Sequence, residues 1–402
     1  MFERLELITA DAILSLMAAF RADTDPHKVD LGVGVYRDDH GETPVPAAVR
    51  AAERALIERQ ATKTYVGPAG NPGFNEEMAR LVLGGEHPSL TAGRVRLIQT
   101  PGGCGALRLG AELIRYASQD SVVHVSTPTW VNHVPLLSGS GLKLERYPYY
   151  DASRGGVLFS GMLAAFERLP PRAVVLLHAS CHNPTGADLS QSEWRELLAL
   201  VKRRQLLPFI DMAYQGLGEG LDADAFGLRL FSAELPEVMF AVSCSKNFGL
   251  YRERAGALGI LCASPAEADA AMSQLVRLAR GLWSMPPDHG AAIVHGVLRD
   301  AKLRAEWVAE VDAMRERVQG LRRELVRQLA AHCPSRDFGF IARQHGMFSL
   351  FGITTEQVRE LRARQHIYMV DDSRVNVAGL RRENLEYFAR SVAAVLAGGA
   401  AR

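Results

Sequence analysis

The stretch Ser243-Cys244-Ser245-Lys246-Asn247-Phe248-Gly249-Leu250-Tyr251-Arg252-Glu253-Arg254 follows directly after the apolar run 238–242. It places a lysine where a buried strand would end, with two hydroxyl side chains before it and an arginine eight residues further on. Such an amine can hold a carbonyl cofactor covalently, while the arginine and the hydroxyls bind a phosphate. A lone lysine in a strand-to-helix loop is more often an ordinary surface residue, so the interpretation depends on the rest of the chain.

The composition is that of an ordinary globular protein of enzyme size. With 402 residues, of which 48% are hydrophobic and 23% charged, the chain can bury at least one large core, and two domains are expected. The 46 basic and 45 acidic residues leave a formal net charge of +1, which gives no field that favours nucleic acid or an anionic membrane. We therefore expect small-molecule partners and neither nucleic acid nor membrane.

The cysteine pattern bears on the compartment. Five cysteines, at positions 104, 181, 244, 262 and 333, are widely scattered and form neither a CxxC pair nor a zinc-ligand spacing. We therefore expect free thiols, a reducing and cytoplasmic location, and no bound metal. The apolar stretch 12–20 is too short to span a bilayer and no basic segment precedes it, so an amphipathic helix is predicted there.

The apolar runs of the chain predict an α/β fold. Several short runs each stop at a polar or small cluster, and a helical pattern follows most of them, which is typical of βα units. Their nearly continuous apolar character indicates a mostly parallel sheet that is covered on both faces by helices. The predicted strands are 95–98, 121–125, 173–178, 206–210, 238–242 and 257–261.

A smaller α+β domain is expected towards the C-terminus. Residues 301–331 form one long charged helical pattern with an apolar stripe, and strand-like segments follow at 347–351 and 374–377. We predict an N-terminal arm and part of the small domain over 1–43, a large domain over 44–312, and a small C-terminal domain over 313–402.

Ligands of a parallel sheet bind beyond the carboxyl ends of its strands, and this sequence concentrates polar residues there. The segment Gly102-Gly103-Cys104-Gly105 would offer backbone N–H groups to a phosphate at a helix N-terminus, although such turns often serve close packing alone. Asp211 ends an apolar run and would need a cation or donors as partners, unless it only caps the next helix. Asn183 precedes Pro184 in a turn that can aim its amide inward, and a plain turn is the alternative.

Four further residues are ambiguous when each is taken alone. Trp130 suits either a core or stacking on a flat ring. Arg254, Arg280 and Arg374 are isolated in sequence, and a lone arginine is usually a surface residue. Guanidinium is nonetheless the best bidentate partner for carboxylate or phosphate.

Taken together, these segments resemble the class I, fold-type I pyridoxal-phosphate-dependent aminotransferases, in particular the aspartate and aromatic amino acid aminotransferase subgroup. The resemblance runs from near residue 1 to near residue 395, and it implies a large domain with a mostly parallel sheet flanked by helices, a smaller α+β domain, and pyridoxal 5'-phosphate as cofactor. The matching segments occur in family order: TKTYVG (62–67), PGGCGALR (101–108), SCHNPTG (180–186), DMAYQG (211–216), SCSKNFGLYRER (243–254), GMFS (346–349) and SRVNVAG (373–379).

The resemblance also implies roles in the chemistry. Lys246 would bind the cofactor covalently and then move the substrate proton as general acid and base. Asp211 would pair with the pyridinium nitrogen, with His133 behind it as its support. Tyr214 and Asn183 would hydrogen-bond the phenolic oxygen. Trp130 would stack on the ring, and Trp130 and Asn183 would also contact the substrate.

The remaining matches would bind anionic groups. By the resemblance, Arg374 and the backbone of Gly34 would bind the substrate α-carboxylate, and Arg280 of a second subunit would receive the distal carboxylate. Tyr65 of a neighbouring subunit would reach the cofactor phosphate, so a homodimer with shared active sites is expected. The phosphate ligands within the chain would be Gly103, Cys104, Ser243, Ser245 and Arg254.

Three departures from the family pattern bear on specificity. Cys104 stands where threonine is usual, which replaces a hydroxyl donor by a weak thiol, and Thr64 stands where aspartate-specific members commonly have asparagine. The usual Asn-Tyr-Ser-Asn after Arg280 is replaced by the more apolar 282–285 segment LWSM. The resemblance, with these departures, implies an aminotransferase for aromatic amino acids, aspartate and glutamate that uses a 2-oxo acid such as 2-oxoglutarate.

Two other functions remain as alternatives. A β-lyase on the same fold would release pyruvate and ammonia without an oxo-acid acceptor, whereas the dicarboxylate-type Arg280 favours transamination. A cofactor-sensing regulatory protein would need an attached nucleic-acid-binding module, and no basic segment of that size precedes residue 30 or follows residue 390. The sequence ranks neither the amino donors nor the possible pathways.

Overall fold

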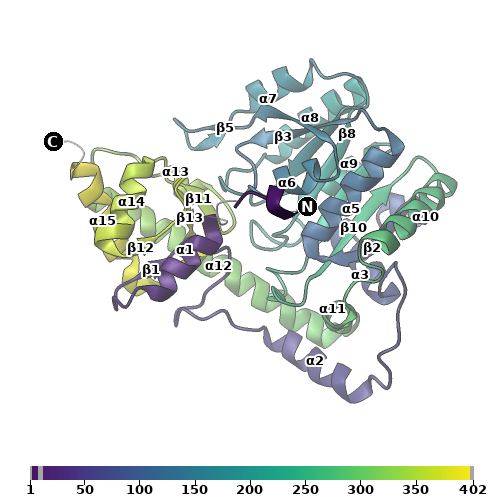
Figure 1. Cartoon of the computed structure of the whole chain (residues 1–402), viewed down its shortest axis with the longest axis horizontal. Coiled ribbons are helices and arrows are strands. Elements are labelled where there is room, and N and C mark those ends of the chain that lie inside the picture. Colours follow the sequence, from purple (N-terminus) through teal and green to yellow (C-terminus); the bar gives the residue numbers. More distant parts are fainter. Residues whose placement is uncertain (1, 8–11, 399–402) are drawn as a thin grey trace. The chain divides into compact units, whose positions relative to one another are not determined.

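The computed structural model describes residues 2–7 and 12–398, and its internal contacts divide the chain into two compact units (Figure 1). The larger unit comprises Pro44–Arg317 together with Gln344–Gly346. The smaller unit comprises the described parts of 1–43, 318–343 and 347–402. The boundary falls inside one long helix, α12 (Ala301–His332), which therefore contributes residues to both units.

A seven-stranded sheet forms the centre of the larger unit. Its strand order is β2-β10-β9-β8-β7-β3-β4, and β10 is antiparallel to both of its neighbours while the other strands run parallel. Every residue of β9 and β10 is buried, as expected for strands covered on both faces. The strands are β2 (Val95–Pro101), β3 (Val122–Thr127), β4 (Lys143–Pro148), β7 (Val174–His178), β8 (Leu207–Met212), β9 (Val238–Ser243) and β10 (Ala255–Leu261).

The predicted α/β class is confirmed, and all six predicted strands lie in this sheet. The sequence pattern missed β4, which pairs only with β3 at the edge. Most residues of β4 are partly or fully exposed and its sequence KLERYP is largely polar, so it has no apolar run to detect. Charged residues are common on edge strands because they discourage pairing with another chain.

Helix α5, which begins directly after β2 ends, packs against the sheet. Gly110 allows this close approach, because a Cβ atom there would lie 2.5 Å from Cζ of Phe209 on β8. A Ser190 capping box starts α8. The helices of the larger unit are α2 (Ala47–Arg59), α3 (Pro72–Leu83), α4 (Pro88–Thr91), α5 (Gly102–Ala117), α6 (His133–Ser138), α7 (Phe159–Phe166), α8 (Gln191–Arg204), α9 (Phe226–Glu234), α10 (Pro265–Leu282) and α11 (Asp288–Arg299), with a hairpin of β5 (Tyr150–Asp151) and β6 (Gly156–Val157).

The smaller unit has an apolar core of its own, in which Phe351 meets Phe388 edge-on at 5.4 Å between ring centroids. Strand β1 pairs in parallel with β12, and β11 pairs antiparallel with β13. Its elements, besides the second half of α12, are η1 (Phe2–Arg4), α1 (Ala12–Ala22), β1 (Val29–Asp30), α13 (Phe340–Arg343), β11 (Phe348–Leu350), α14 (Thr355–Gln365), β12 (Ile367–Tyr368), β13 (Arg374–Asn376), η2 (Val377–Gly379), η3 (Arg382–Asn384) and α15 (Leu385–Gly398).

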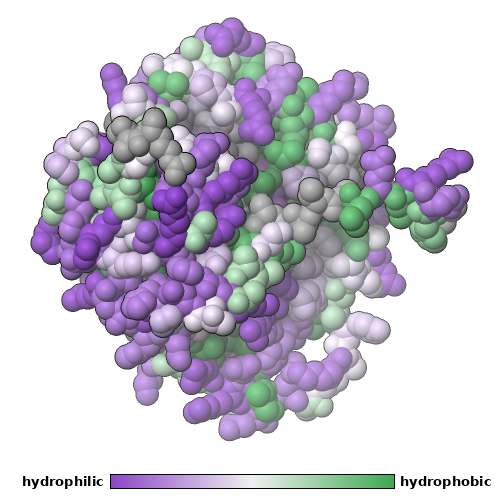
Figure 2. Space-filling model, turned by 60° about the vertical axis from the view of Figure 1, so that its left-hand side comes forward, coloured by the Kyte–Doolittle hydropathy of each residue, from purple (hydrophilic) through white to green (hydrophobic). Residues whose placement is uncertain are grey.

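The surface is mixed in character. On the face drawn in Figure 2, hydrophilic residues predominate and hydrophobic residues occur in small groups among them. None of the helices in the described part of the chain has both the length and the hydrophobicity that crossing a bilayer requires. All five cysteines are free thiols.

A histidine joins two segments of the smaller unit that lie far apart in the sequence. Nδ1 of His366, the residue before β12, lies 2.7 Å from Oδ2 of Asp23, and its Nε2 lies 3.5 Å from Oδ2 of Asp25. Tyr368 also donates a hydrogen bond to Oδ2 of Asp23. The hydrogen bond to Asp23 raises the pKa of His366 above its ordinary value. The protonated imidazole is therefore favoured in the folded chain.

We predict a pH-dependent contribution of His366 to stability. A raised pKa in the folded state stabilises the protein fully below the ordinary histidine pKa of about 6.5, and the contribution is lost as the pH rises through the raised value. His366→Asn, which tolerates the left-handed backbone there (φ 50°), should lower the free energy of unfolding more at about pH 6 than at about pH 9. Urea unfolding at several pH values measures the difference. His40→Asn, an exposed control, should show no such trend, and equal losses at both pH values would contradict the prediction.

Candidate active site

The amine and the carboxylate singled out in the sequence lie at the same edge of the sheet. Strands β8 and β9 are parallel neighbours, with Asp211 opposite Ala241 in register, and Lys246 follows three residues after the end of β9. Lys246 is half-buried, and its Nζ lies 5.2 Å from the ring centroid of Tyr214, which follows β8. The strand ends thus bring the lysine, the aspartate and the tyrosine to one place.

Asp211 is a buried carboxylate that stays ionised. Its Oδ2 lies 3.1 Å from Nε2 of His133, whose Nδ1 is 2.7 Å from the hydroxyl of Thr129. Burial works to raise the pKa of Asp211, but the hydrogen bond with His133 and the nearby His133, His178 and Lys246 lower it overall. An ionised carboxylate at this depth is suited to hold a cation such as a protonated ring nitrogen.

His178 lies beside this pair. Ligand atoms of His133, His178 and Asp211 lie within 4.8 Å of one another, a grouping that in principle suits a metal ion. In this structure the hydrogen bond between His133 and Asp211 uses one atom of each. Burial lowers the pKa of His178 to about 4, so its ring is neutral near pH 7. The arrangement resembles a hydrogen-bonded support for Asp211 more than an open metal site.

Asn183 and Tyr214 form a pair of hydrogen-bonding groups. The amide Nδ2 of Asn183 donates to the Tyr214 hydroxyl at 3.3 Å, and both side chains are buried. The peptide bond between Asn183 and Pro184 is cis. These two side chains present an amide and a phenol to the same point, as hydrogen-bond donors to an oxygen would require.

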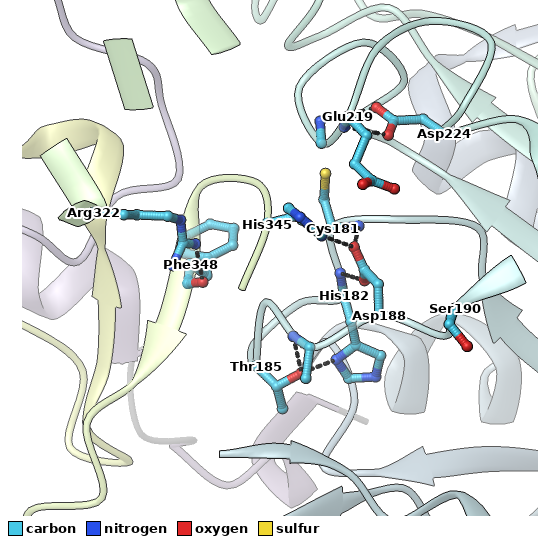
Figure 3. Close-up of polar contacts among 12 residues, drawn as sticks. Cys181, His182, Thr185, Asp188, Ser190, Glu219, Asp224, Arg322, His345 and Phe348 are labelled. Carbon is cyan, nitrogen blue, oxygen red and sulfur yellow. Dashed lines mark hydrogen bonds and ion pairs between the residues drawn. The ribbon is translucent and has the colours of Figure 1, made fainter. Parts of the chain in front are cut away.

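The turn that carries Asn183 is held in place by a carboxylate (Figure 3). Asp188 accepts hydrogen bonds from the backbone N–H groups of Cys181 at 2.7 Å and His182 at 2.8 Å. The hydroxyl of Thr185 lies 2.9 Å from Nδ1 of His182 and accepts from the N–H of Ala187. The backbone around Asn183 is therefore fixed by local hydrogen bonds before any ligand binds.

The start of α5 and the arginine of the lysine segment form an anion cradle. Gly102 has a left-handed backbone (φ 68°), and a Cβ atom there would lie 2.6 Å from Nη2 of Arg254. Nη1 of Arg254 donates to the hydroxyl of Ser245 at 3.3 Å, and a Cβ on Gly103 would lie 3.2 Å from Cβ of Ser243. Backbone N–H groups at a helix N-terminus, a guanidinium and two hydroxyls are the donor set that a phosphate requires.

Cys104 belongs to the same cradle. Burial raises the pKa of its thiol, while the charges of Arg254 and Lys246 lower it in part and that of Asp211 raises it further. At neutral pH the thiol is therefore protonated. A protonated thiol is a weak hydrogen-bond donor, so the backbone and Arg254 would supply most of the binding to a phosphate.

Trp130 packs against His133, the hydrogen-bond partner of Asp211. Its ring meets the ring of His133 edge-on, with the centroids 5.3 Å apart, and it packs against the core of the sheet. This location next to the partner of Asp211 suits stacking on a ring that Asp211 binds. The assembled groups therefore fit a phosphorylated pyridine aldehyde: an amine, a carboxylate for the ring nitrogen, donors for an oxygen, and a phosphate cradle.

Two predicted residues of the larger unit stand apart from this group. Tyr65 lies in the segment between α2 and α3 and is 89% exposed. Arg280, near the end of α10, is exposed and donates to the hydroxyl of Ser284 at 3.0 Å. The two segments are linked, because the N–H of Val66 lies 3.1 Å from Sδ of Met285. Within the described residues, neither predicted side chain is hydrogen-bonded to the group around Lys246.

Arg374 and Gly34 belong to the smaller unit. Arg374 is 5% exposed, donates to the carbonyl of Gly32 at 2.8 Å, and lies 4.5 Å over the ring of Phe348. A Cβ atom on Gly34 would lie 2.9 Å from Cζ of the same ring. Asn376 fixes the backbone here by donating to the carbonyls of residues 33 and 35. Arg374 and the 32–35 segment thus lie together around Phe348.

Sequence reasoning overlooked the contact of Phe348 with Arg374, because a phenylalanine in a short apolar strand is usually part of a core. Gly102 belongs to the 102–105 segment that the sequence predicts to bind a phosphate, and it lies against Arg254. His133, which the resemblance places behind Asp211, lies 3.1 Å from the Asp211 carboxylate.

The comparisons with known proteins agree with this geometry. Residues 26–392 match the family model described as aminotransferase class I and II. The aromatic-amino-acid aminotransferase of Pseudomonas aeruginosa is 47% identical over 98% of this chain and 99% of its own length. The aspartate aminotransferase of the same organism is 42% identical over 98% and 100%. The aromatic-amino-acid aminotransferase of Burkholderia pseudomallei, solved with covalently bound pyridoxal phosphate, is 45% identical, with a TM-score of 0.96 over 98% of this chain and 99% of that one.

The site is typical of enzymes that use a carbonyl cofactor, because a lysine, a buried carboxylate and a phosphate cradle lie together at the strand ends of an α/β unit. More specifically, the chain belongs to the class I and II aminotransferase family. The family resemblance seen in the sequence is thereby confirmed.

We predict that Gly102→Ala weakens phosphate binding without unfolding the protein. The added Cβ would meet the movable end of Arg254 at 2.6 Å and would strain a left-handed backbone by about 1–2 kcal/mol. Displacing the guanidinium from the cradle should lower the affinity for pyridoxal phosphate roughly tenfold or more, since 1.4 kcal/mol is a factor of ten. Equilibrium dialysis of the apoprotein measures this. Gly85→Ala, where nothing lies within 4 Å of the added atom, is the control, and equal affinities for the two variants would contradict the prediction.

Proposed function

We propose that this chain is a pyridoxal-phosphate-dependent aminotransferase. It moves the amino group between an aromatic or dicarboxylic L-amino acid (Tyr, Phe, Trp, Asp or Glu) and a 2-oxo acid such as 2-oxoglutarate by a ping-pong mechanism. The observation that carries the proposal is the Lys246 amine next to an ionised, buried Asp211 and a phosphate cradle. The names of the two bacterial relatives, aromatic-amino-acid and aspartate aminotransferase, support the substrate range.

When bound, the cofactor supplies a ring that accepts the electron pair released at the substrate Cα. Asp211 would hold the ring nitrogen protonated, because the carboxylate remains ionised through its hydrogen bond with His133. At an effective dielectric constant near 20, such a pair at ~4 Å is worth about 4 kcal/mol. The amine of Lys246 would hold the cofactor covalently and, once released by the substrate, would move the proton from the substrate Cα to C4′ of the cofactor.

The neighbouring side chains orient the cofactor. Tyr214 and Asn183 would donate to its phenolic oxygen, and their mutual hydrogen bond places both groups for this. Trp130, which packs against His133, would stack on the cofactor ring. The phosphate would occupy the cradle, which consists of Arg254, Gly103, Cys104, Ser243 and Ser245.

Two arginines would bind the substrate carboxylates. Arg374, with the backbone near Gly34, would bind the α-carboxylate that every amino acid substrate carries. Arg280 would bind the distal carboxylate of aspartate or glutamate, and its exposed position leaves it available to a second subunit. The apolar segment around Trp283 and Met285 would make room for aromatic side chains.

The proposal includes a homodimer with shared active sites, and the two residues that stand apart support it. Tyr65 and Arg280 lie in linked, exposed segments of one chain, and we propose that they complete the active site of the other. The free cysteines support a reducing, cytoplasmic location. We propose domain limits near residues 43 and 312, with α12 joining the two domains.

A single-turnover experiment tests the reaction. Addition of glutamate to the pyridoxal form of the protein should convert the cofactor to pyridoxamine phosphate, and 2-oxoglutarate should reverse it. Borohydride reduction before substrate, followed by peptide mapping, should place the label on Lys246. The Lys246→Ala variant should bind the cofactor only reversibly and lose at least 10⁴-fold of the rate, the upper end of general acid–base contributions. Release of pyruvate and ammonia from an amino acid with a leaving group on Cβ of a three-carbon skeleton, without an oxo acid, would identify a lyase instead. A label elsewhere would refute the proposal.

The role of Arg280 gives a second prediction. Arg280→Leu should lower kcat/KM for aspartate and glutamate about 10²-fold, because an unpaired carboxylate in the closed site costs 2–5 kcal/mol. The values for tyrosine and phenylalanine should change less than tenfold, since they have no distal carboxylate. Steady-state kinetics with the four donors measures both. A uniform loss across all four would show that Arg280 supports the fold and does not select substrates.

A further inference from the structure

Trp307, on the first half of α12, contacts the segment that carries Lys246. Its side chain is fully buried, and its indole N–H donates to the carbonyl of Asn247 at 2.7 Å. Its ring also stacks on Phe248, with the centroids 4.4 Å apart and the planes 10° apart. One side chain therefore holds both residues that follow the lysine, through a hydrogen bond and a ring contact.

Asn247 also links the lysine segment to the segment that carries Tyr214. Its side-chain amide donates to the carbonyl of Gln215 at 3.1 Å, and both residues are buried. Gln215 is in turn held by hydrogen bonds from its own amide to the carbonyls of Leu81 and Leu221. The lysine segment and the tyrosine segment are thus joined through Asn247.

The same face of α12 contacts the tyrosine segment directly. Val311 packs so closely on Gly216 that a Cβ atom there would lie 2.5 Å from its Cγ1, and Gly216 has a positive φ of 96°. Arg315 donates to the carbonyl of Gly216 at 3.3 Å. Residues 307, 311 and 315 are spaced by four and so share one helix face.

We propose that Trp307 is a positioning residue, which sets where the Lys246 amine stands relative to Tyr214 and Asp211. The proposal rests on the proposed function, because it concerns the lysine that would carry the cofactor. Lys246 has a long side chain with several rotatable bonds, so the position of its backbone helps to set where the amine stands. Misplacement of a reacting group by about 1 Å can cost 10²-fold in rate. A residue that fixes the backbone of Lys246 can therefore affect the rate without touching the reacting atoms.

The decisive variant is Trp307→Phe, which keeps a ring to stack on Phe248 and removes the N–H donor to Asn247. The holoenzyme should still form. The pH at which the visible absorption of the bound cofactor titrates should move by at least about 0.3 unit, since the amine and the Tyr214 hydroxyl control that titration. In steady-state kinetics, kcat should fall roughly tenfold while KM changes less than about twofold, the pattern of an interaction made in the transition state.

Trp194→Phe is the matched control. Trp194 is also a buried tryptophan of the larger unit, and it contacts Phe231 edge-on at 5.3 Å between α8 and α9. Its replacement removes the same atoms from a core site, so it should lower stability without shifting the titration or kcat. If Trp307→Phe does not fold, Arg315→Met tests the same helix face at its less buried end and should shift the titration in the same direction by a smaller amount.

Two results would overturn the inference. One is a titration of Trp307→Phe or Arg315→Met that coincides with that of the unmodified enzyme. The other is an equal shift in Trp194→Phe, which would indicate general loosening of the unit. Borohydride labelling of Lys246 in each variant separates these outcomes from a failure of the proposed function, because the label would still be found on Lys246 if only the positioning role were wrong.

Discussion

The hydrogen bond between Asp211 and His133 is the interaction on which the site depends. A carboxylate buried to 7% exposure would ordinarily take up a proton, because burial disfavours its charged form. The hydrogen bond with His133 and the nearby Lys246 reverse that preference. The Thr129 hydroxyl lies 2.7 Å from the other ring nitrogen of His133. The sheet then determines where this negative charge stands, since Asp211 lies near the end of a central strand whose neighbour leads to Lys246. The charge of Asp211 thus depends on its polar neighbours, whereas its position depends on the sheet.

The sequence predicted those parts of the structure that have local signals. The six buried strands and the long helix over 301–331 have clear apolar patterns, and Lys246, Asp211, Asn183 and Arg254 belong to segments with a strong family resemblance. Strand β4 was missed because an edge strand exposed to water has no apolar run. Trp307 was read correctly as part of an apolar stripe, but its hydrogen bond to Asn247 spans 60 residues and depends on tertiary packing. The sequence pattern does not indicate which backbone carbonyl will accept a hydrogen bond from an indole N–H.

The roles proposed for Tyr65 and Arg280 remain predictions that depend on a second subunit. Both residues are exposed on a single chain, and each acquires a role only if a second subunit faces it. Motif resemblance can identify such residues, whereas the contacts within one chain cannot. The link between Val66 and Met285 shows why the two segments would act together, because they share one surface region. A change in the 282–285 segment would therefore affect the environment of Tyr65 as well as that of Arg280.

The two arginines that we propose to bind the substrate carboxylates differ in burial and in hydrogen bonding. Arg374 is buried, stacked over Phe348 and hydrogen-bonded to the carbonyl of Gly32, so its rotamer freedom is already lost before binding. Arg280 is exposed and is held by one hydroxyl, so it keeps more conformational freedom. A pre-organised group binds an unchanging ligand with less entropic cost, whereas an adaptable group tolerates ligands that differ. The α-carboxylate is common to all amino acid substrates and the side chain is not, so rigidity at Arg374 and freedom at Arg280 are what an enzyme of dual specificity requires.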